Sequence, residues 1–335
     1  MNIWVILPRI PIFRWEFLLL ATVLFLISFP IVAYILFTIM LKRTDREKWS
    51  RTCSNDEQAQ RDMYAIGMAW YEENKERCTE LHMVHEKLNL FGEYYDFGFD
   101  RAVIVVPGRT ESLRYGYYFA KPYVESGYNL LVIDQRAHGD SDGKYNTVGF
   151  NEHRDVIAWA RLIHERFGVR SILLHGICIG SSCSLFALTS PDCPSYLDGM
   201  VAEGMYPTFY ENFKNHMVAL KKPSFPFMFF INMWMKLFTG YSMKRGPIHV
   251  IDRYKKPLLM LHSREDLYSL PSTAVTLYEK AGSEKKELFW FEKGAHSQLR
   301  ITDTEAYDGA IKKFLAELDA EPTAKEPMKA QVSEN

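Results

Sequence analysis

The sequence predicts an α/β protein whose mostly parallel sheet is covered by helices on both faces. Apolar, strand-like runs alternate with segments of helical periodicity, which is typical of parallel strands joined by crossover helices. The expected strands are Ala102–Val106, Asn129–Asp134, Ser171–His175, Leu197–Glu203, Pro257–Ser263 and Glu287–Phe291. The expected helices are Leu113–Gly127, Gly149–Phe167, Pro271–Gly282 and Thr302–Leu318. A chain of 335 residues that is 47% hydrophobic can bury one large core and a small addition.

A glycine-flanked cysteine narrows this fold class. Gly176-Ile177-Cys178-Ile179-Gly180 follows an expected strand and precedes a segment of small residues, Ser181–Thr189. This order of strand, turn and helix is that of the nucleophile elbow in the α/β-hydrolase fold, with cysteine where serine is usual. The elbow strains the backbone of its nucleophile, so glycine is expected on either side for steric reasons. A thiol at a helix N-terminus is favoured as thiolate, its reactive form.

The same fold predicts where the partners of Cys178 lie, because its acid and its histidine follow the nucleophile in that order along the chain. Asp266 comes just after one expected strand, and His296 comes just after the last one. We expect Asp266 to orient His296, and His296 to activate Cys178 as general base and later to protonate the leaving group. Taken singly, each of the two could be an ordinary loop or turn residue. Glu265 is a weaker candidate for the acid.

A literal Gly-x-Ser-x-Gly pattern occurs at residues 139–143 and would offer Ser141 as the nucleophile. No apolar helix directly follows it, and the two aspartates beside the serine would disfavour a developing oxyanion. We therefore interpret this segment as a loop that does not supply the nucleophile.

An oxyanion hole needs two backbone N–H groups aimed at the developing negative charge. The expected donors are Ile179, directly after the nucleophile, and Arg109, in the loop that follows the strand Ala102–Val106. Gly108 would let this loop approach closely. The Arg109 side chain could bind an anionic substrate group, pair with Glu111 or be solvated.

These motifs resemble a known family. From about Leu88 to Leu318 the chain is similar to the serine-aminopeptidase-like α/β-hydrolases, which include monoacylglycerol lipases and bacterial lysophospholipases. Residues 107–112 are similar to the Gly-Arg-x-Glu-Ser motif of the latter, and residues 134–141 to a D-x-R-x-x-G-x-S loop of many hydrolases. The resemblance implies the fold and the triad, while this fold hosts many substrates. Cys178 replaces the family's serine, as in dienelactone hydrolases and polyhydroxyalkanoate synthases, and Ser181 replaces a frequent second glycine.

A long apolar segment precedes this region. Phe17–Leu41 contains no charged residue and is long enough to span a bilayer, even with Pro30 inside it. A cleaved signal peptide is the alternative, but its apolar core should be shorter and end at small residues. Basic residues that follow the segment are Lys42, Arg43, Arg46, Lys48 and Arg51, and those before it are Arg9 and Arg14. By the positive-inside rule, a single-pass protein would keep its catalytic domain in the cytoplasm.

The remaining segments set the expected domain boundaries. After an N-terminal flank (1–16) and the anchor (17–41), residues 42–86 are expected to hold an amphipathic helix at 56–81, which packs on the core or lies on the membrane. The hydrolase domain is expected over 87–319, and a disordered tail over 320–335. Five cysteines, Cys53, Cys78, Cys178, Cys183 and Cys193, cannot all pair, which favours a reducing compartment.

A lid is expected at about 206–252, where aromatic residues and methionines are concentrated. Its uncharged stretch, 223–235, is too short for a second membrane span. Such adaptable side chains suit a flexible apolar substrate, and we expect Phe209, Phe229 and Trp234 to contact it. An ordinary hydrophobic lid core is the alternative.

The sequence thus predicts a membrane-anchored hydrolase of esters or thioesters of apolar acids, acting through an acyl-cysteine intermediate. The alternatives are an acyltransferase with the same triad and a non-catalytic lipid-binding protein of this fold. Neither a metal nor an organic cofactor is implied, and a net charge of −1 gives no indication of nucleic-acid binding. Deletion of residues 1–41 is expected to release a soluble core.

Overall fold

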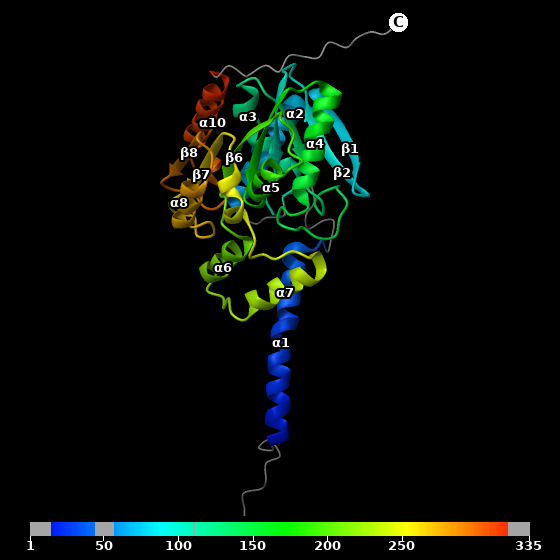
Figure 1. The fold of residues 1–335 in the computed structure, drawn as a ribbon, viewed down its shortest axis with the longest axis vertical. Coiled ribbons are helices and arrows are strands. Elements are labelled where there is room, and N and C mark those ends of the chain that lie inside the picture. Colours follow the sequence, from blue (N-terminus) through cyan, green and yellow to red (C-terminus); the bar gives the residue numbers. More distant parts are fainter. Residues whose placement is uncertain (1–14, 44–56, 110, 321–335) are drawn as a thin grey trace, which may run out of the picture.

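A computed structural model describes residues 15–43, 57–109 and 111–320 (Figure 1). Cys53, the basic residues Arg46, Lys48 and Arg51, and the predicted tail after Ala320 lie outside the described residues.

The core of the fold is one sheet of eight strands in the order β1-β2-β4-β3-β5-β6-β7-β8. The strands are β1 (Cys78–His85), β2 (Leu88–Tyr95), β3 (Arg101–Val106), β4 (Asn129–Ile133), β5 (Ser171–Ile177), β6 (Leu197–Glu203), β7 (Leu258–Ser263) and β8 (Lys286–Phe291). β2 pairs antiparallel with both β1 and β4, and every pair from β4 to β8 is parallel. The carboxyl ends of the parallel strands therefore meet at one edge, where ligands of such sheets bind.

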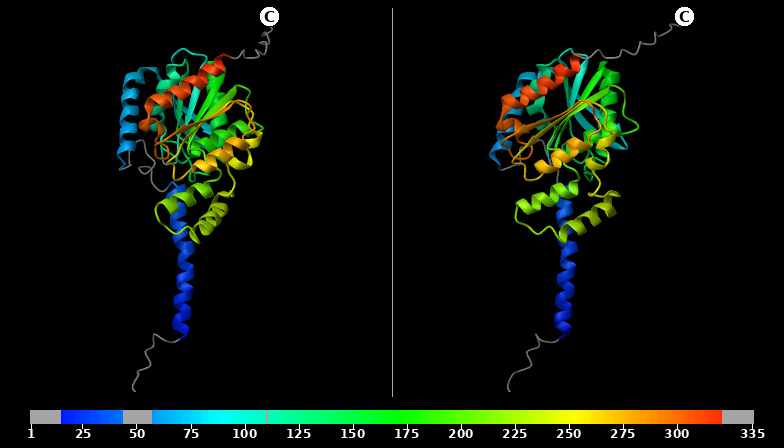
Figure 2. Two further views of the ribbon diagram at one scale, coloured as in Figure 1. Left: turned by 90° about the vertical axis from the view of Figure 1, so that its left-hand side faces the viewer. Right: turned by 60° about the vertical axis from the view of Figure 1, so that its left-hand side comes forward.

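Helices cover both faces of the sheet, as the sequence predicts (Figure 2). They are α1 (Trp15–Leu41), α2 (Gln58–Asn74), η3 (Lys75–Arg77), η4 (Leu113–Phe119), α3 (Ala120–Val124), α4 (Glu152–Phe167), α5 (Ile179–Thr189), α6 (Phe209–Ala219), α7 (Phe227–Thr239), η5 (Pro247–His249), η6 (Ile251–Arg253), α8 (Pro271–Lys280), α9 (Leu299–Thr302) and α10 (Thr304–Asp319). α4, α5 and α8 share one apolar core cluster, represented by Trp159, Leu185 and Leu277. α2, η4, α3 and α10 share a second cluster, represented by Tyr117 and Tyr307.

Two local expectations differ from the structure. The predicted amphipathic helix ends at Asn74 rather than Leu81, because the chain turns and enters β1 at Cys78, so the sheet begins before residue 87. The predicted helix 113–127 is a 3-10 segment followed by the short helix α3. In that 3-10 segment Gly116 lies so close to β4 that an added Cβ would be 2.6 Å from Val132 Cγ1.

Helix α1 extends from the domain as a single long rod, and α6 and α7 lie beside its C-terminal part (Figures 1 and 2). It is long and apolar enough to cross a membrane, and residues 16–27 are exposed on all sides. One side of its last part, formed by Ala33, Phe37 and Met40, is buried among lid residues. Trp234 Nε1 donates to the Pro30 carbonyl at 2.9 Å. The Asn146 N–H donates to the Leu41 carbonyl at 2.8 Å. The end of the predicted anchor is thus built into the folded domain.

Candidate active site

Cys178 lies at the sharp turn between β5 and α5. Its backbone is in a conformation that non-glycine residues rarely adopt, with φ 52° and ψ −109°, and its N–H donates to the Glu203 carbonyl at 2.9 Å. The flanking glycines are sterically required, because a Cβ at Gly176 would lie 2.4 Å from the Gly180 carbonyl oxygen. A Cβ at Gly180 would lie 2.0 Å from the carbonyl oxygen of Val106. Strain of this kind gathers at functional sites.

Ser181, the residue that departs from the family pattern, is buried directly behind the nucleophile. Its hydroxyl is 2.7 Å from the Gly176 carbonyl oxygen and 3.0 Å from the Glu203 carbonyl oxygen. The hydroxyl thus ties the elbow to the ends of two neighbouring strands, a contact that glycine could not make.

The structure brings Asp266 and His296 together beside Cys178. Asp266, in the loop after β7, accepts a hydrogen bond at 2.7 Å between its Oδ2 and Nδ1 of His296, which follows β8. Its Oδ1 accepts the N–H groups of Tyr268 at 2.8 Å and Ser269 at 2.9 Å, which fixes the carboxylate. The alternative acid, Glu265, lies 3.4 Å from the N–H of Gly294 and no hydrogen bond joins it to His296.

The pKa values of His296 and Asp266 are shifted in opposite directions by their neighbours. Burial alone would lower the pKa of His296, but the negative charges of Cys178 and Asp266 raise it well above its usual value. Burial alone would raise the pKa of Asp266, but the His296 charge and hydrogen bonds hold it below its usual value. Nε2 of His296 makes no hydrogen bond of standard geometry in the described part of the chain. That nitrogen is available to a reacting group next to Cys178.

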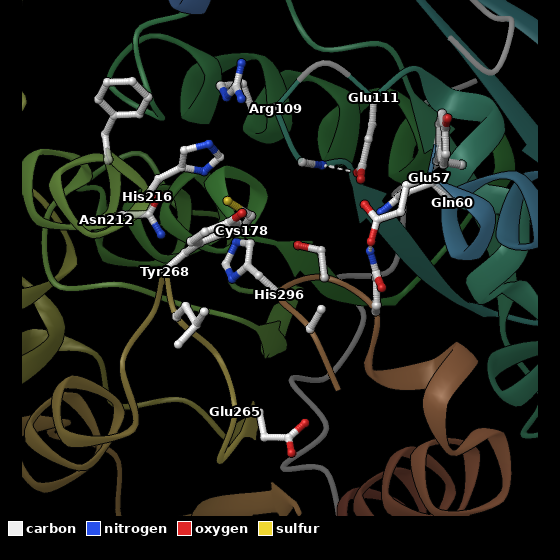
Figure 3. Close-up of a pocket in the computed structure, with 17 residues that line it drawn as sticks. Glu57, Gln60, Arg109, Glu111, Cys178, Asn212, His216, Glu265, Tyr268 and His296 are labelled. Carbon is white, nitrogen blue, oxygen red and sulfur yellow. Dashed lines mark hydrogen bonds between the residues drawn. The ribbon is translucent and has the colours of Figure 1, made fainter. Parts of the chain in front are cut away.

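Cys178 and His296 border a cavity of about 730 Å³ (Figure 3). Tyr268 lies between two imidazoles, with its ring centroid 5.5 Å from that of His296 and 4.3 Å from that of His216. The lining mixes charged and polar side chains with apolar and aromatic ones, in contrast to the expected apolar cap. The lining residues are Glu57, Gln60, Gly108, Arg109, Glu111, Tyr115, Cys178, Asn212, Phe213, His216, Glu265, Leu267, Tyr268, Ala295, His296, Ser297 and Gln298.

The loop after β3 forms one wall of the cavity and contains the expected oxyanion donor Arg109. Glu111 Oε2 accepts the Gly108 N–H at 2.7 Å, which shapes this loop. Burial raises the pKa of Glu111 to about 7, opposed by the Gly108 hydrogen bond. Burial also lowers the pKa of Arg109, and the negative charge of Cys178 opposes that shift. Ile179, the other expected donor, is buried at the start of α5.

A network of buried, hydrogen-bonded side chains behind the site was not predicted from the sequence. The Tyr307 hydroxyl donates to Glu203 Oε2 at 2.6 Å and lies 3.1 Å from His175 Nε2. Burial raises the pKa of Glu203, although the bond from Tyr307 opposes this. The available signal was a carboxylate at the end of the apolar strand β6, at the edge where the nucleophile lies.

The three lid residues expected to contact substrate lie elsewhere. Phe209 is buried and packs against Tyr206, and Trp234 is hydrogen-bonded to α1. Phe229 is exposed on α7. None of the three lines the described cavity. The lid residues that do line the cavity are Asn212, Phe213 and His216, all in α6. The lid aromatics instead pack α7 against α1, a use of these residues that composition alone does not reveal.

Ser141 is fully buried and does not line the cavity. Its Oγ donates to the Asp134 carbonyl at 2.7 Å and accepts the Phe91 N–H at 2.9 Å. Both contacts are to backbone, so this serine holds a loop against β2.

Comparison with known proteins supports the fold. Residues 101–226 match the sequence-family model that describes the alpha/beta hydrolase fold. The uncharacterized protein YqkD of Bacillus subtilis is 28% identical over 216 residues, which cover 64% of this chain and 70% of that protein. The Pyrococcus furiosus esterase Pf2001 superposes with a TM-score of 0.62 at 23% identity, covering 74% of this chain and 93% of that one. A structure of DcsB with its substrate analogue superposes with a TM-score of 0.58 at 16% identity. The match covers 73% of this chain and 100% of that one. The chain therefore has the α/β-hydrolase fold.

Proposed function

We propose that this chain, which has the α/β-hydrolase fold, cleaves carboxylic ester or thioester bonds through an acyl intermediate on Cys178. The observation that carries the proposal is the strained turn at Cys178, with φ 52°, beside the His296–Asp266 pair in one cavity. Esterases among the similar structures support ester hydrolysis as the general reaction.

The proposed mechanism gives each of these groups one role. A protonated His296 favours the thiolate of Cys178 by charge attraction, and the sulfur attacks the carbonyl carbon. The N–H groups of Ile179 and Arg109 would hold the resulting oxyanion. His296 then gives its proton to the leaving alcohol or thiol, and the carbonyl reforms as a thioester. Water, deprotonated by His296, releases the acid and restores the thiol, while Asp266 keeps the ring oriented.

The proposed substrate has an apolar acyl group and a polar leaving group, and it comes from a membrane. Helix α1 supports this origin, since it would hold the domain at a bilayer as a single-pass anchor. The basic residues after α1 support a cytoplasmic position. The polar lining around Arg109, Asn212 and His216 suits the leaving group rather than the acyl chain.

Acyl transfer is the second candidate, and the cysteine itself favours it. An acyl thioester reacts with amines and thiols more readily than an oxygen ester does, so an acceptor bound in the cavity could replace water. Addition of such acceptors during turnover would lower the yield of free acid and produce the amide or thioester.

Steady-state hydrolysis of activated acyl esters by the full chain in detergent tests the proposal. The Cys178→Ala variant should lose turnover, while Cys193→Ala, a matched change at a partly buried cysteine remote from the cavity, should retain it. Ser141→Ala should retain the chemistry as well. Turnover by Cys178→Ala near the wild-type rate would refute the assignment.

A further inference from the structure

We propose that the outer side of the lid is a membrane-docking surface that lies at the boundary between the headgroups and the acyl chains of the bilayer leaflet nearest the domain and prefers anionic lipid. This lid surface consists of Phe225, Phe229, Met233 and Leu237 with the neighbouring lysines Lys221, Lys222 and Lys236. The inference depends on the part of the proposed function that makes α1 a membrane anchor, and it adds a second contact with the bilayer.

The length of α1 places the lid at the membrane. From Glu16 to Leu41 the helix is about 39 Å long at about 1.5 Å per residue, whereas the hydrocarbon core is about 30 Å thick. If the charged Glu16 stays at the far boundary, the near boundary falls about twenty residues on, close to Ile35. Lid residues already contact α1 at Phe29 and Pro30, which lie farther from the domain than this boundary.

Helix α7 has the faces of an interfacial helix. One face, formed by Met228, Ile231 and Met235, is buried in a cluster that also contains Phe37 of α1 and Ile179 of the domain. A second face contacts α1 through Phe227, Trp234 and Phe238. α7 crosses α1 rather than running along it (Figure 1). Its remaining face therefore points away from the domain, toward the free end of α1.

That remaining face is apolar and exposed. Phe229 is 57% exposed and Leu237 is 68% exposed, and Phe225, in the loop before α7, is 81% exposed. Large apolar side chains gathered at one place on a surface mark an interaction site. The partner that reaches this position on every molecule is the bilayer in which α1 lies, and a helix lying flat there buries its apolar face at the boundary between headgroups and acyl chains.

The charge of the lid fits an anionic leaflet. Residues 206–246 carry six Lys or Arg and one acidic residue, Glu211. Lys221, Lys222 and Lys236 are exposed, and none pairs with a carboxylate among the residues that the structure describes. Each lysine near an anionic surface strengthens binding by about fivefold, equivalent to about 1 kcal/mol. Lysine stems can also extend along the apolar surface while the ammonium groups stay in water.

This docking would bring the bilayer next to the catalytic cavity. Helix α6 precedes the lid surface and contributes Asn212, Phe213 and His216 to the cavity lining. The same lid therefore contacts the lipid on one side and the reaction site on the other, which would shorten the path of a lipid-derived substrate.

Photo-crosslinking in the full chain tests the proposal. The photoreactive amino acid p-benzoylphenylalanine would replace Phe229 or Phe225, with Leu24 on the exposed part of α1 as positive control and Phe99 of the distant β2–β3 loop as negative control. Each protein would be reconstituted in vesicles of phosphatidylcholine alone or of equal parts phosphatidylcholine and phosphatidylglycerol. Retained thermal unfolding would show that each variant folds.

We expect lipid adducts at Leu24, Phe229 and Phe225 and none at Phe99. Anionic lipid should raise the yield at Phe229 severalfold, and Lys221→Glu with Lys222→Glu should abolish that rise. Adducts at Leu24 without adducts at Phe229 would overturn the docking surface and leave the anchor standing, whereas no adduct at Leu24 would overturn both. Crosslinks from Phe229 to a second copy of the chain, or equal yields in the two vesicles, would also contradict the proposal. Because these adducts do not require turnover, the result is independent of the chemistry proposed for Cys178.

Discussion

The burial of α1 in the lid predicts that Phe37 stabilises the folded domain. Phe37 is 0% exposed, and its ring centroid lies 5.7 Å from those of both Tyr145 and Phe238. Phe37→Ala would leave a cavity in a cluster that also contains Ile179 and touches Cys178. Phe-to-Ala changes in cores cost about 3–5 kcal/mol, the loss expected here.

Thermal unfolding of the full chain in detergent measures this loss. At about 2–4 °C per kcal/mol, the melting temperature of Phe37→Ala should fall by roughly 10 °C. Phe17→Ala is the matched control, because Phe17 lies on the same helix but is 56% exposed. It should change the melting temperature little. Equal melting temperatures for the two variants would show that α1 is only a tether and would refute the reasoning.

The same contacts revise the expectation that deletion of residues 1–41 releases a soluble core. That deletion removes Phe37, Met40 and Leu41, each nearly or fully buried. The burial of each side chain stabilises the folded state by about 1.5–3 kcal/mol. The sum is comparable to the about 5–15 kcal/mol that stabilises a whole domain. A chain that begins at Ser28 keeps these contacts and should therefore fold, whereas a chain that begins at Lys42 should aggregate. Equal stability of the two truncated chains would contradict this.

Three further predictions concern the site. His296→Ala should slow acylation by roughly three orders of magnitude, as losses of triad members do, and an unchanged rate of single-turnover acylation would point to another base. Gly180→Ala should abolish activity and lower the melting temperature, because its Cβ would lie 2.0 Å from the Val106 carbonyl oxygen; wild-type activity would exclude the strained turn. Burial raises the pKa of Glu111 from an ordinary 4.5 to about 7, so the folded state holds a proton that the unfolded state releases and stability should fall as pH rises from 4.5 to about 7. Glu111→Gln should flatten this part of the melting profile, and an identical slope in the variant would argue against the buried carboxyl.

The sequence was informative where function depends on local spacing. Gly176 and Gly180 predict the turn at Cys178, because a side chain at either position would collide with neighbouring backbone. The parallel strands were recognisable as apolar runs, and the chain order of Asp266 and His296 followed from the fold. The pairing of their side chains at 2.7 Å then required only that both loops meet at one sheet edge.

The rest depends on contacts between distant segments. Trp234 bonds to Pro30, which lies 204 residues earlier, and composition cannot tell whether a lid tryptophan contacts substrate, core or anchor. Glu57 and Gln60 line the cavity because α2 folds back beside the loops after β3 and β8. Neither β1 nor β2 was among the predicted strands. β1 is an edge strand with exposed side chains, so its pattern resembles that of a surface helix.

The most direct test of the central claim is the intact mass of the full chain quenched during turnover of an activated acyl ester, followed by peptide mapping. We predict one added acyl group on the peptide that contains Cys178, present in Cys193→Ala and absent in Cys178→Ala. An acyl group on another residue, or an adduct that persists in Cys178→Ala, would contradict the assignment of Cys178 as the nucleophile.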